Sequence, residues 1–178
     1  MDGFKGFQYH PDAMNESDLI WVQLKTPKGP LSIGWGERGL TRITLNEGHP
    51  NTGQPKAKFD KFLGDLDDYL SGKKVRFKVP FDLSGHTPFR EQVLRACAEI
   101  PYGRTVSYGD LAFEIGKPQA ARAVGQAMAH NTIPIVIPCH RVLSSNGIGG
   151  FMQHCSEGLE WKRYLLGLEG VRVQAGLP

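Results

Sequence analysis

The sequence is organised around the stretch IPIVIPCHRV at residues 133–142. Its first five residues are apolar, which is typical of a buried strand, and Pro138 marks the end of that strand because proline has no backbone N–H to give to a sheet. Cys139 and His140 follow directly. We therefore expect a strand over 133–137 that delivers a cysteine and a histidine to the end of an element, where reactive side chains can reach a cleft.

Upstream of this stretch, two short helices are predicted around Gly116. Ser107 is placed to cap a helix that runs through Ile115, and Pro118 is placed to open a second helix that runs through Ala129. Two helices joined by a glycine turn are typical of a helix-turn-helix. The arrangement predicts a DNA-binding motif in the second half of the chain.

The second of these helices, AARAVGQAMA at 120–129, carries small side chains and the single arginine Arg122. Reading bases in the major groove needs Asn, Gln, Arg or Lys, which this helix largely lacks. Its face fits close packing into a minor groove with Arg122 inserted. It equally fits plain packing of one helix on another, and the pattern taken alone favours that second alternative.

Further outward, the rest of the chain divides into two parts. Residues 19–25, 31–35 and 40–45 read as an antiparallel meander, an apolar stripe of period 3.6 predicts a helix from Phe59 to Leu70, and 75–79 reads as a short strand. Thr87 and Pro88 open a helix that ends at 101–103, and the last helix is expected at about 157–168, with Leu159 among its buried residues. The predicted fold class is α+β: a small N-terminal domain of antiparallel sheet and helix over residues 1–83, and a mainly helical C-terminal domain with a helix-turn-helix over 84–178.

Composition limits the class of protein. The chain has 178 residues, of which 40% are hydrophobic and 22% charged, and it has no run near the roughly 20 apolar residues of a membrane span. The first residues lack the apolar run of a secretory signal, and three cysteines without CxxC spacing suit a reducing compartment. We expect no membrane association and a cytoplasmic location, or a nuclear one in a eukaryote. The net charge of +3 is mild, but residues 115–156 contain no Asp or Glu, which suits an anionic partner or a buried apolar segment.

The Cys139-His140 pair allows three interpretations. A lone cysteine is usually inert and buried. Here the neighbouring His140 and Arg141 favour thiolate and predict a nucleophile with a lowered pKa. The third interpretation is a zinc site with His154 and Cys155, but adjacent residues seldom bind one ion, so no metal is expected.

The motif IPCHRV at 137–142 resembles the active-site motif of the O6-alkylguanine-DNA alkyltransferases. The resemblance continues, in order, through TPF at 87–89, PYG at 101–103, VSY at 106–108, ARAVG at 121–125, Asn131, and LLGLEG at 165–170. It covers residues 87–170 and leaves the N-terminal part with little of the signal. It implies stoichiometric, irreversible transfer of an alkyl group from O6-alkylguanine, and from O4-alkylthymine as a further substrate, to the protein. It also implies no cofactor, a monomer, and double-stranded DNA containing O6-alkylguanine as the partner.

The resemblance also implies a role for each matching residue. Cys139 is similar to the alkyl acceptor, His140 to the base that activates it through a water, and Glu169 to the carboxylate that orients the imidazole. Asn131 is similar to the residue that ties the recognition helix to the active-site turn, and Tyr108 to the phenol that hydrogen-bonds guanine N3. The remaining matches are expected to contact DNA: Arg122 by filling the gap left by a flipped nucleotide, Ser145 in the loop over the alkyl pocket, and Arg90, Gly109 and Lys117 at the backbone.

Two features of the sequence depart from the family pattern. Two other functions also remain as alternatives. Phe151 stands where a tyrosine is common, and the segment 152–157 is longer than usual; both departures lie near the expected alkyl pocket and bear on substrate range rather than on activity. One other function is a non-catalytic alkyltransferase-like protein that binds DNA damage; such relatives lack the cysteine that this chain has. The other is a thiol hydrolase or redox protein, which leaves Arg122 in its small-residue helix unexplained.

Overall fold

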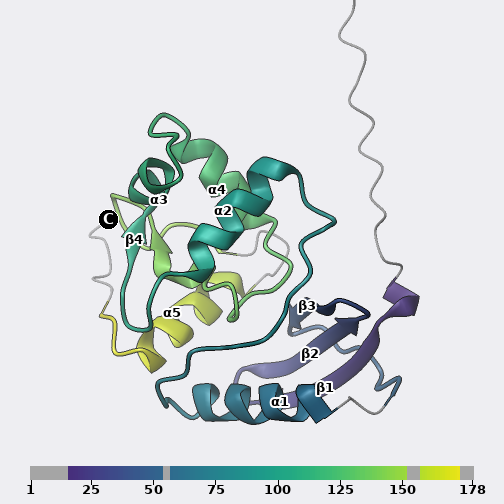
Figure 1. Ribbon diagram of the computed structural model, residues 1–178. Helices are drawn as coiled ribbons and strands as arrows, with labels where there is room; N and C mark the ends of the chain where they lie inside the picture. The colour runs from purple at the N-terminus through teal and green to yellow at the C-terminus, as the bar shows by residue number, and fades with distance from the viewer. Residues whose placement is uncertain (1–15, 54–56, 152–156, 173–178) are drawn as a thin grey trace, which may run out of the picture.

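The computed structural model describes residues 16–53, 57–151 and 157–172 and has the predicted α+β architecture (Figure 1). The N-terminal part consists of three strands and one helix: β1 (Ile20–Thr26), β2 (Gly29–Gly36), β3 (Gly39–Leu45) and α1 (Ala57–Leu70). The C-terminal part is mainly helical, with α2 (Pro88–Ala98), α3 (Tyr108–Glu114), α4 (Ala121–Ala129), α5 (Gly158–Leu168) and a parallel pair of two-residue strands, β4 (Val106–Ser107) and β5 (Val142–Leu143). Short 3₁₀ turns lie at Glu16–Asp18 and Cys139–Arg141.

The three strands form an antiparallel sheet in the order β1-β2-β3, as the meander pattern predicts. Helix α1 packs on the sheet through its apolar stripe: Phe59, Phe62 and Leu66 are buried, and the Phe59 ring meets the Trp35 ring edge-on at 4.5 Å between centroids. Continuing the same spacing by three residues buries Tyr69 as well. Tyr69 is thus a buried residue near the end of α1, and its hydroxyl reaches Glu169 after α5.

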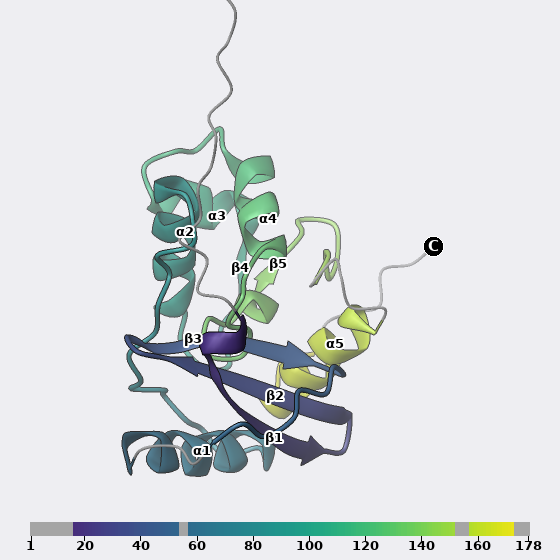
Figure 2. The same cartoon turned by 90° about the vertical axis from the view of Figure 1, so that its right-hand side faces the viewer.

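Strand β3 attaches the sheet to the helical part. Its Ile43 N–H donates to the Thr132 carbonyl at 2.9 Å, and its Leu40 N–H donates to the Pro80 carbonyl at 2.9 Å. The buried side chains of both parts form one hydrophobic cluster, and Figure 2 shows the sheet between α1 and the helical part. An edge strand whose backbone groups are used in this way is not free to pair with another chain.

The helices of the C-terminal part begin with recognisable caps. Thr87 accepts a hydrogen bond from the Arg90 N–H at 3.3 Å with Pro88 in the first turn, and Ser107 forms a capping box with Asp110. Gly116 then has a φ of +73°, which ends α3 and turns the chain toward α4. Helix α4 begins at Ala121, three residues later than the sequence predicts from Pro118, and has no side-chain cap.

Two predicted strands are wrong. Residues 75–79 form no strand: Val75, Phe77 and Val79 pack against the core at alternate positions, so their pattern reports burial rather than pairing in a sheet. Residues 133–137 form a compact buried turn, in which Ile135 has a φ of +74° and the Ile137 N–H donates to the Ile133 carbonyl at 2.9 Å. An apolar run of five residues predicts burial, but its periodicity does not distinguish a strand from a turn.

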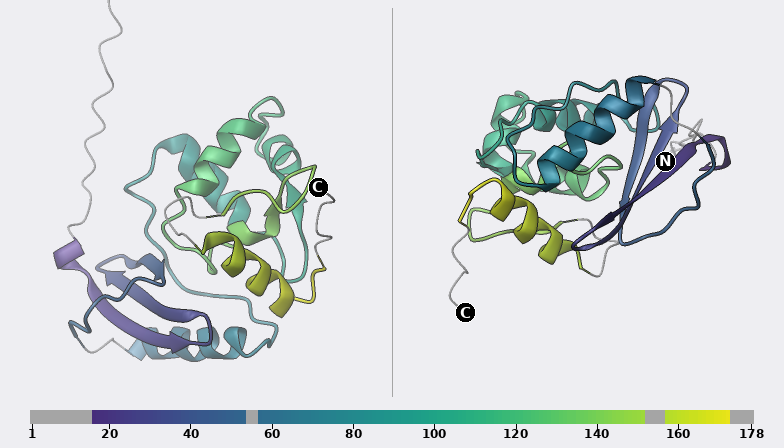
Figure 3. Two further views of the ribbon diagram at one scale, coloured as in Figure 1. Left: turned by 180° about the vertical axis from the view of Figure 1, so that it is seen from behind. Right: turned by 90° about the horizontal axis from the view of Figure 1, so that it is seen from below.

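The last helix, α5, lies beneath the other helices of the C-terminal part (Figure 3). It buries Trp161, Leu165 and Leu166, whereas Leu159, expected to be buried, is exposed. No helix in the described ranges is both long and apolar enough to cross a membrane. The unusual segment noted in the sequence lies, except for Glu157, outside the described residues, and so do His154 and Cys155.

Gly39→Ala is expected to destabilise the protein by about 2 to 3 kcal/mol, because Gly39 has a φ of +128° and an added Cβ would clash with the Pro80 carbonyl oxygen. Gly64→Ala is the matched control. Gly64 is exposed inside α1 with open space at its Cβ position, so the change should stabilise the protein by roughly 0.5 to 1 kcal/mol. Urea unfolding of both variants measures the difference, and equal stabilities would contradict the junction described here.

Candidate active site

Cys139 is the first residue of the 3₁₀ turn, and its side chain is held by Asn131. The Asn131 Nδ2 group donates to Cys139 Sγ at 3.0 Å and to the Ile137 carbonyl at 2.9 Å, while its Oδ1 accepts from the Ile133 N–H at 3.0 Å. Asn131 follows α4 after a single residue, so it links this helix to the cysteine. One buried amide therefore fixes both ends of the 133–137 turn and the direction of the thiol.

The residue after Cys139 belongs to a fully buried hydrogen-bond network around Glu169. His140 Nε2 lies 2.8 Å from Glu169 Oε1, and Arg141 donates to both carboxylate oxygens through Nε and Nη2. The Gly103 N–H donates to Oε2 at 3.0 Å, and the Tyr69 hydroxyl donates to Oε1 at 2.6 Å. The carboxylate is thus shared among four residues from three separate segments of the chain.

These contacts decide the protonation state of the pair. Burial alone would raise the pKa of Glu169, but the hydrogen bonds from His140 and Arg141 hold that pKa well below its ordinary value. Burial lowers the pKa of His140 despite the carboxylate beside it, so the imidazole is neutral at pH 7. A carboxylate only accepts hydrogen bonds, so His140 Nε2 carries the proton and Nδ1 is left as a bare acceptor.

The pKa of the Cys139 thiol differs from the value that the sequence predicts. Burial raises the pKa of Cys139 to about 11, and the Asn131 hydrogen bond and the positive charge of Lys162 only partly offset this rise. The lowered pKa expected from His140 and Arg141 is therefore wrong for the free protein, because both side chains are committed to Glu169. Cys139 rests as a neutral thiol beside a neutral base.

Lys162 is the second buried cation of the site. Its Nζ donates to the carbonyls of Val142 at 2.7 Å and Gly150 at 3.0 Å, which ties α5 to the chain on both sides of the loop at 144–149. Burial lowers the pKa of Lys162 to about 8. The lysine thus fixes the loop while placing a positive charge near Cys139.

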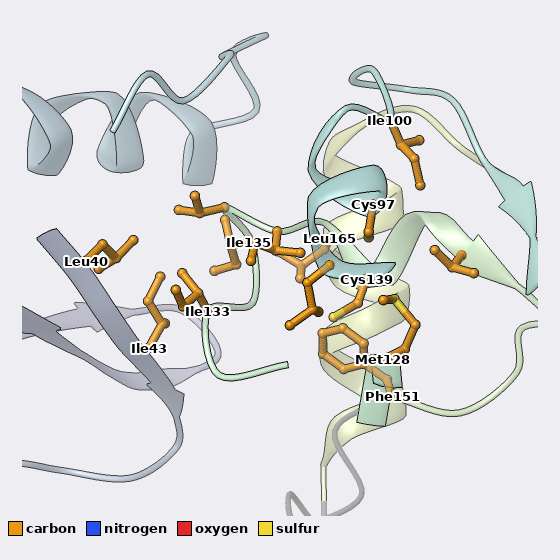
Figure 4. Packing of buried hydrophobic residues seen from close by; sticks show 14 of the residues in the cluster. Leu40, Ile43, Cys97, Ile100, Met128, Ile133, Ile135, Cys139, Phe151 and Leu165 are labelled. Carbon is orange, nitrogen blue, oxygen red and sulfur yellow. The ribbon is translucent and has the colours of Figure 1, made fainter. Parts of the chain in front are cut away.

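Cys139 lies at the floor of a pocket of about 460 Å³, within the usual size range of ligand sites. The residues around the pocket come from α3, α4 and the loop before α5: Tyr108, Arg122, Ala123, Gly125, Gln126, Met128, Ala129, Gly150 and Phe151. Figure 4 shows Cys139 beside Met128 and Phe151. Tyr108 and Arg122, predicted from sequence, are therefore brought to the cysteine.

The other predicted residues do not line this pocket. Gly109, Lys117 and Ser145 are exposed, and the Lys117 ammonium lies 5.3 Å from the centroid of the Phe89 ring. Arg90 lines a different pocket, of about 410 Å³, between β3 and α2. A cavity of about 910 Å³ lies elsewhere, beside the 74–77 segment, and does not include Cys139.

Sequence reasoning missed two residues of the site, Tyr69 and Lys162. It also missed that Arg141 binds the Glu169 carboxylate. Arg141 and Lys162 had a weak signal: Arg141 closely follows the apolar run 133–138, and Lys162 shares helical spacing with Leu165 and Leu166 on an apolar stripe. Tyr69 had no such signal. It lies on an apolar stripe, and a tyrosine at such a position is predicted to be an ordinary core residue.

This α+β fold, with Cys139 under a pocket beside the small-residue helix α4, is that of a DNA-repair alkyltransferase. Residues 88–171 match the family model described as 6-O-methylguanine DNA methyltransferase, DNA binding domain. A methylated-DNA--protein-cysteine methyltransferase of Mycobacterium bovis is 40% identical over 160 residues, which is 86% of this chain and 94% of the relative.

Two solved structures agree with this match. The crystal structure of Mycobacterium tuberculosis O6-methylguanine methyltransferase has a TM-score of 0.73 at 36% identity and covers 90% of this chain and 95% of its own. The same species' OGT in complex with DNA has a TM-score of 0.70 at 37% identity and covers 84% and 91%. The chain belongs to the methylated-DNA--protein-cysteine methyltransferase family and is an enzyme of DNA repair.

The rate of alkyl transfer from an O6-alkylguanine free base is expected to vary little between about pH 7 and 8, below the pKa of about 8 of the neighbouring Lys162. Neutral His140 is present throughout, and the Cys139 thiol, with a pKa of about 11, stays protonated. The rate should fall only below the ordinary histidine pKa of about 6.5, as the lowered pKa of His140 is passed. Single-turnover rate constants across this range test the expectation, and a rise of about tenfold per pH unit above pH 7, as for attack by a standing thiolate whose thiol has a pKa of about 11, would contradict it.

Proposed function

We propose that this protein removes the alkyl group from O6-alkylguanine in duplex DNA by transferring it to Cys139, once per molecule and irreversibly. The observation that carries the proposal is the pocket in which Cys139, Tyr108 and Arg122 meet. A thiol, a phenol and an exposed arginine are the groups needed to attack an alkyl carbon, protonate a leaving base and hold open a duplex. O4-alkylthymine, which presents a similar alkyl–oxygen bond, is a further candidate substrate.

The chemistry begins with His140 as base. Its Nδ1 is buried and has no protein partner in the described part of the chain, so it is free to take the Cys139 proton through a bridging water. The sulfur then attacks the alkyl carbon while the bond from that carbon to O6 breaks, and its electron pair passes into the guanine ring. Glu169 stabilises the imidazolium that forms.

Two further side chains act on the substrate. Burial raises the pKa of Tyr108, which keeps its phenol protonated as a donor to the guanine N3, where charge develops. Asn131 holds the sulfur in one direction through its 3.0 Å contact. The product is a thioether, which neither water nor a second thiol readily cleaves, so the protein is not regenerated.

The depth of the thiol requires the nucleotide to leave the duplex. Cys139 is only 4% exposed, and a stacked base would not reach it, so the target is flipped out at a cost of a few kcal/mol. Arg122 is exposed on α4 together with Ala123 and Gln126, and the small alanine lets the helix approach the minor groove. Arg122 fills the space that the flipped base leaves.

Contacts to the DNA backbone extend from this helix. Gly109 and Lys117 are exposed on or just after α3, Ser145 is exposed on the loop beside the pocket, and Arg90 lies at the start of α2. No acidic residue interrupts positions 115–156, so the phosphates meet little repulsion there. The structure of the relative from M. tuberculosis in complex with DNA supports DNA as the partner of this chain.

Cys139→Ser is expected to abolish transfer and to leave DNA affinity within about twofold, because the thiol is the acceptor but is too buried to contribute to binding. Intact-protein mass spectrometry after exposure to O6-methylguanine DNA measures the mass gain, and peptide mapping locates it. Cys97→Ser is the control and should react normally. Label on Cys97 would overturn the assignment, and tight binding without any mass gain would indicate the non-catalytic damage-binding function.

Arg122→Ala is expected to slow repair of duplex DNA by a factor on the order of 100, since several kcal/mol of flipping cost lose their compensation. Reaction with an O6-alkylguanine free base, which needs no flipping, should change less than about twofold. Lys117→Ala serves as a control for loss of positive charge and should weaken binding evenly across sequences. Equal losses on the duplex and the free base would leave Arg122 as a purely structural residue.

A further inference from the structure

Tyr69 is a buried residue of the N-terminal part that reaches the active site. It lies near the end of α1, and its hydroxyl is 2.6 Å from Glu169 Oε1 and 3.2 Å from His140 Nε2. Its side chain is 0% exposed, and its ring packs against Phe77 and Tyr102 at centroid distances of 5.6 and 6.1 Å. The other donors to Glu169 all lie in the C-terminal part, so Tyr69 is the one contribution of α1 to this network among the described residues.

We propose that Tyr69 is a positioning residue for alkyl transfer: it holds the Glu169 carboxylate against His140 and thereby keeps the histidine in the tautomer that leaves Nδ1 free for the cysteine proton. This inference rests on the proposed function, in which Cys139 is the acceptor and His140 the base. It also assigns the N-terminal part a share in the chemistry.

The direction of the hydrogen bonds supports this role. A carboxylate only accepts, so the Tyr69 hydroxyl donates its proton to Oε1, and its lone pairs then face the His140 Nε2–H. The same hydroxyl therefore contacts both members of the pair and fixes the plane of the imidazole relative to the carboxylate. Hydrogen bonds of this kind set the tautomer and orientation of a histidine.

The donors also compete for the same oxygen. Oε1 of Glu169 accepts from Tyr69, from His140 and from Arg141. The charged groups that face His140 are Glu169, Arg141 and Lys162, and Tyr69 is the neutral donor among its neighbours. Removing the hydroxyl leaves more of the carboxylate charge for the histidine, so the pKa of His140 should rise.

Tyr69→Phe keeps the ring and removes only the hydroxyl. The rate constant for transfer from an O6-alkylguanine free base should fall by a factor on the order of ten, by analogy with the loss that follows removal of the hydrogen-bond partner that orients a metal-binding histidine. The acidic limb of the rate profile should move to higher pH. A residue that merely fills the core would leave this limb where it is.

Tyr102→Phe is the matched control. Its hydroxyl donates to the Leu168 carbonyl at 2.8 Å, beside Glu169, and to the Gly72 carbonyl at 3.3 Å, across the same junction, but it does not touch the pair. This variant should keep the wild-type pH profile and react within about twofold of the wild-type rate. If both variants lose rate equally with unchanged pH profiles, the junction is only structural and the proposal is overturned.

A measurement on the wild-type protein keeps the proposal testable if Tyr69→Phe does not fold. In protein labelled with ¹⁵N-histidine, the resonances of His140 should report a neutral ring protonated at Nε2 at pH 7. The other tautomer would overturn the proposal. Wild-type rates and pH profile in a well-folded Tyr69→Phe would do the same while leaving the proposed function intact, whereas failure of wild-type Cys139 to gain mass would sink the proposed function itself.

Discussion

A single buried carboxylate, Glu169, organises the structure around the site. An unpaired charge at this depth would cost several kcal/mol, so the chain must surround it with donors. It does so with Tyr69 from α1, Gly103 from the turn after α2, and His140 and Arg141 from the 3₁₀ turn. Satisfying one charge thus brings together the N-terminal helix, the cysteine-bearing turn and the end of α5 (Figure 1).

The buried position of Cys139 keeps its thiol protonated at rest, so that attack requires a separate base. Burial raises the pKa of Cys139 and so keeps its thiol protonated, which lowers its reactivity toward adventitious electrophiles and oxidants; the proposed single use of this thiol makes such protection valuable. In the proposed mechanism, reactivity depends on a base held in one tautomer rather than on a standing thiolate. The His140–Glu169 pair is assigned that role, and the raised pKa of the Cys139 thiol is the reason that its geometry has to be well defined.

Helix α4, which carries the proposed DNA-binding face, has two different faces. Helix α4 has small, exposed residues around Arg122, while Val124, Ala127 and Met128 face the core. The inner face confirms packing of one helix on another, and the exposed outer face is the one that the proposed function assigns to the minor groove. Because α4 leads after one residue into Asn131, which holds the thiol, its position is linked directly to that of Cys139.

Hydrophobic periodicity by itself determined the α+β class, the sheet and the order of the helices, and the resemblance of short motifs to a known family pointed to Cys139, His140, Glu169, Tyr108 and Arg122. Local patterns carry this information because burial and capping depend on neighbours in the chain. Only the tertiary structure decided that 133–137 is a turn closed by Asn131, that the thiol pKa is raised rather than lowered, and that Tyr69 belongs to the site. These three depend on burial and on contacts between distant segments: an apolar tyrosine position looks the same in sequence whether its hydroxyl meets a lone backbone carbonyl or, as here, a carboxylate one hundred residues further along the chain.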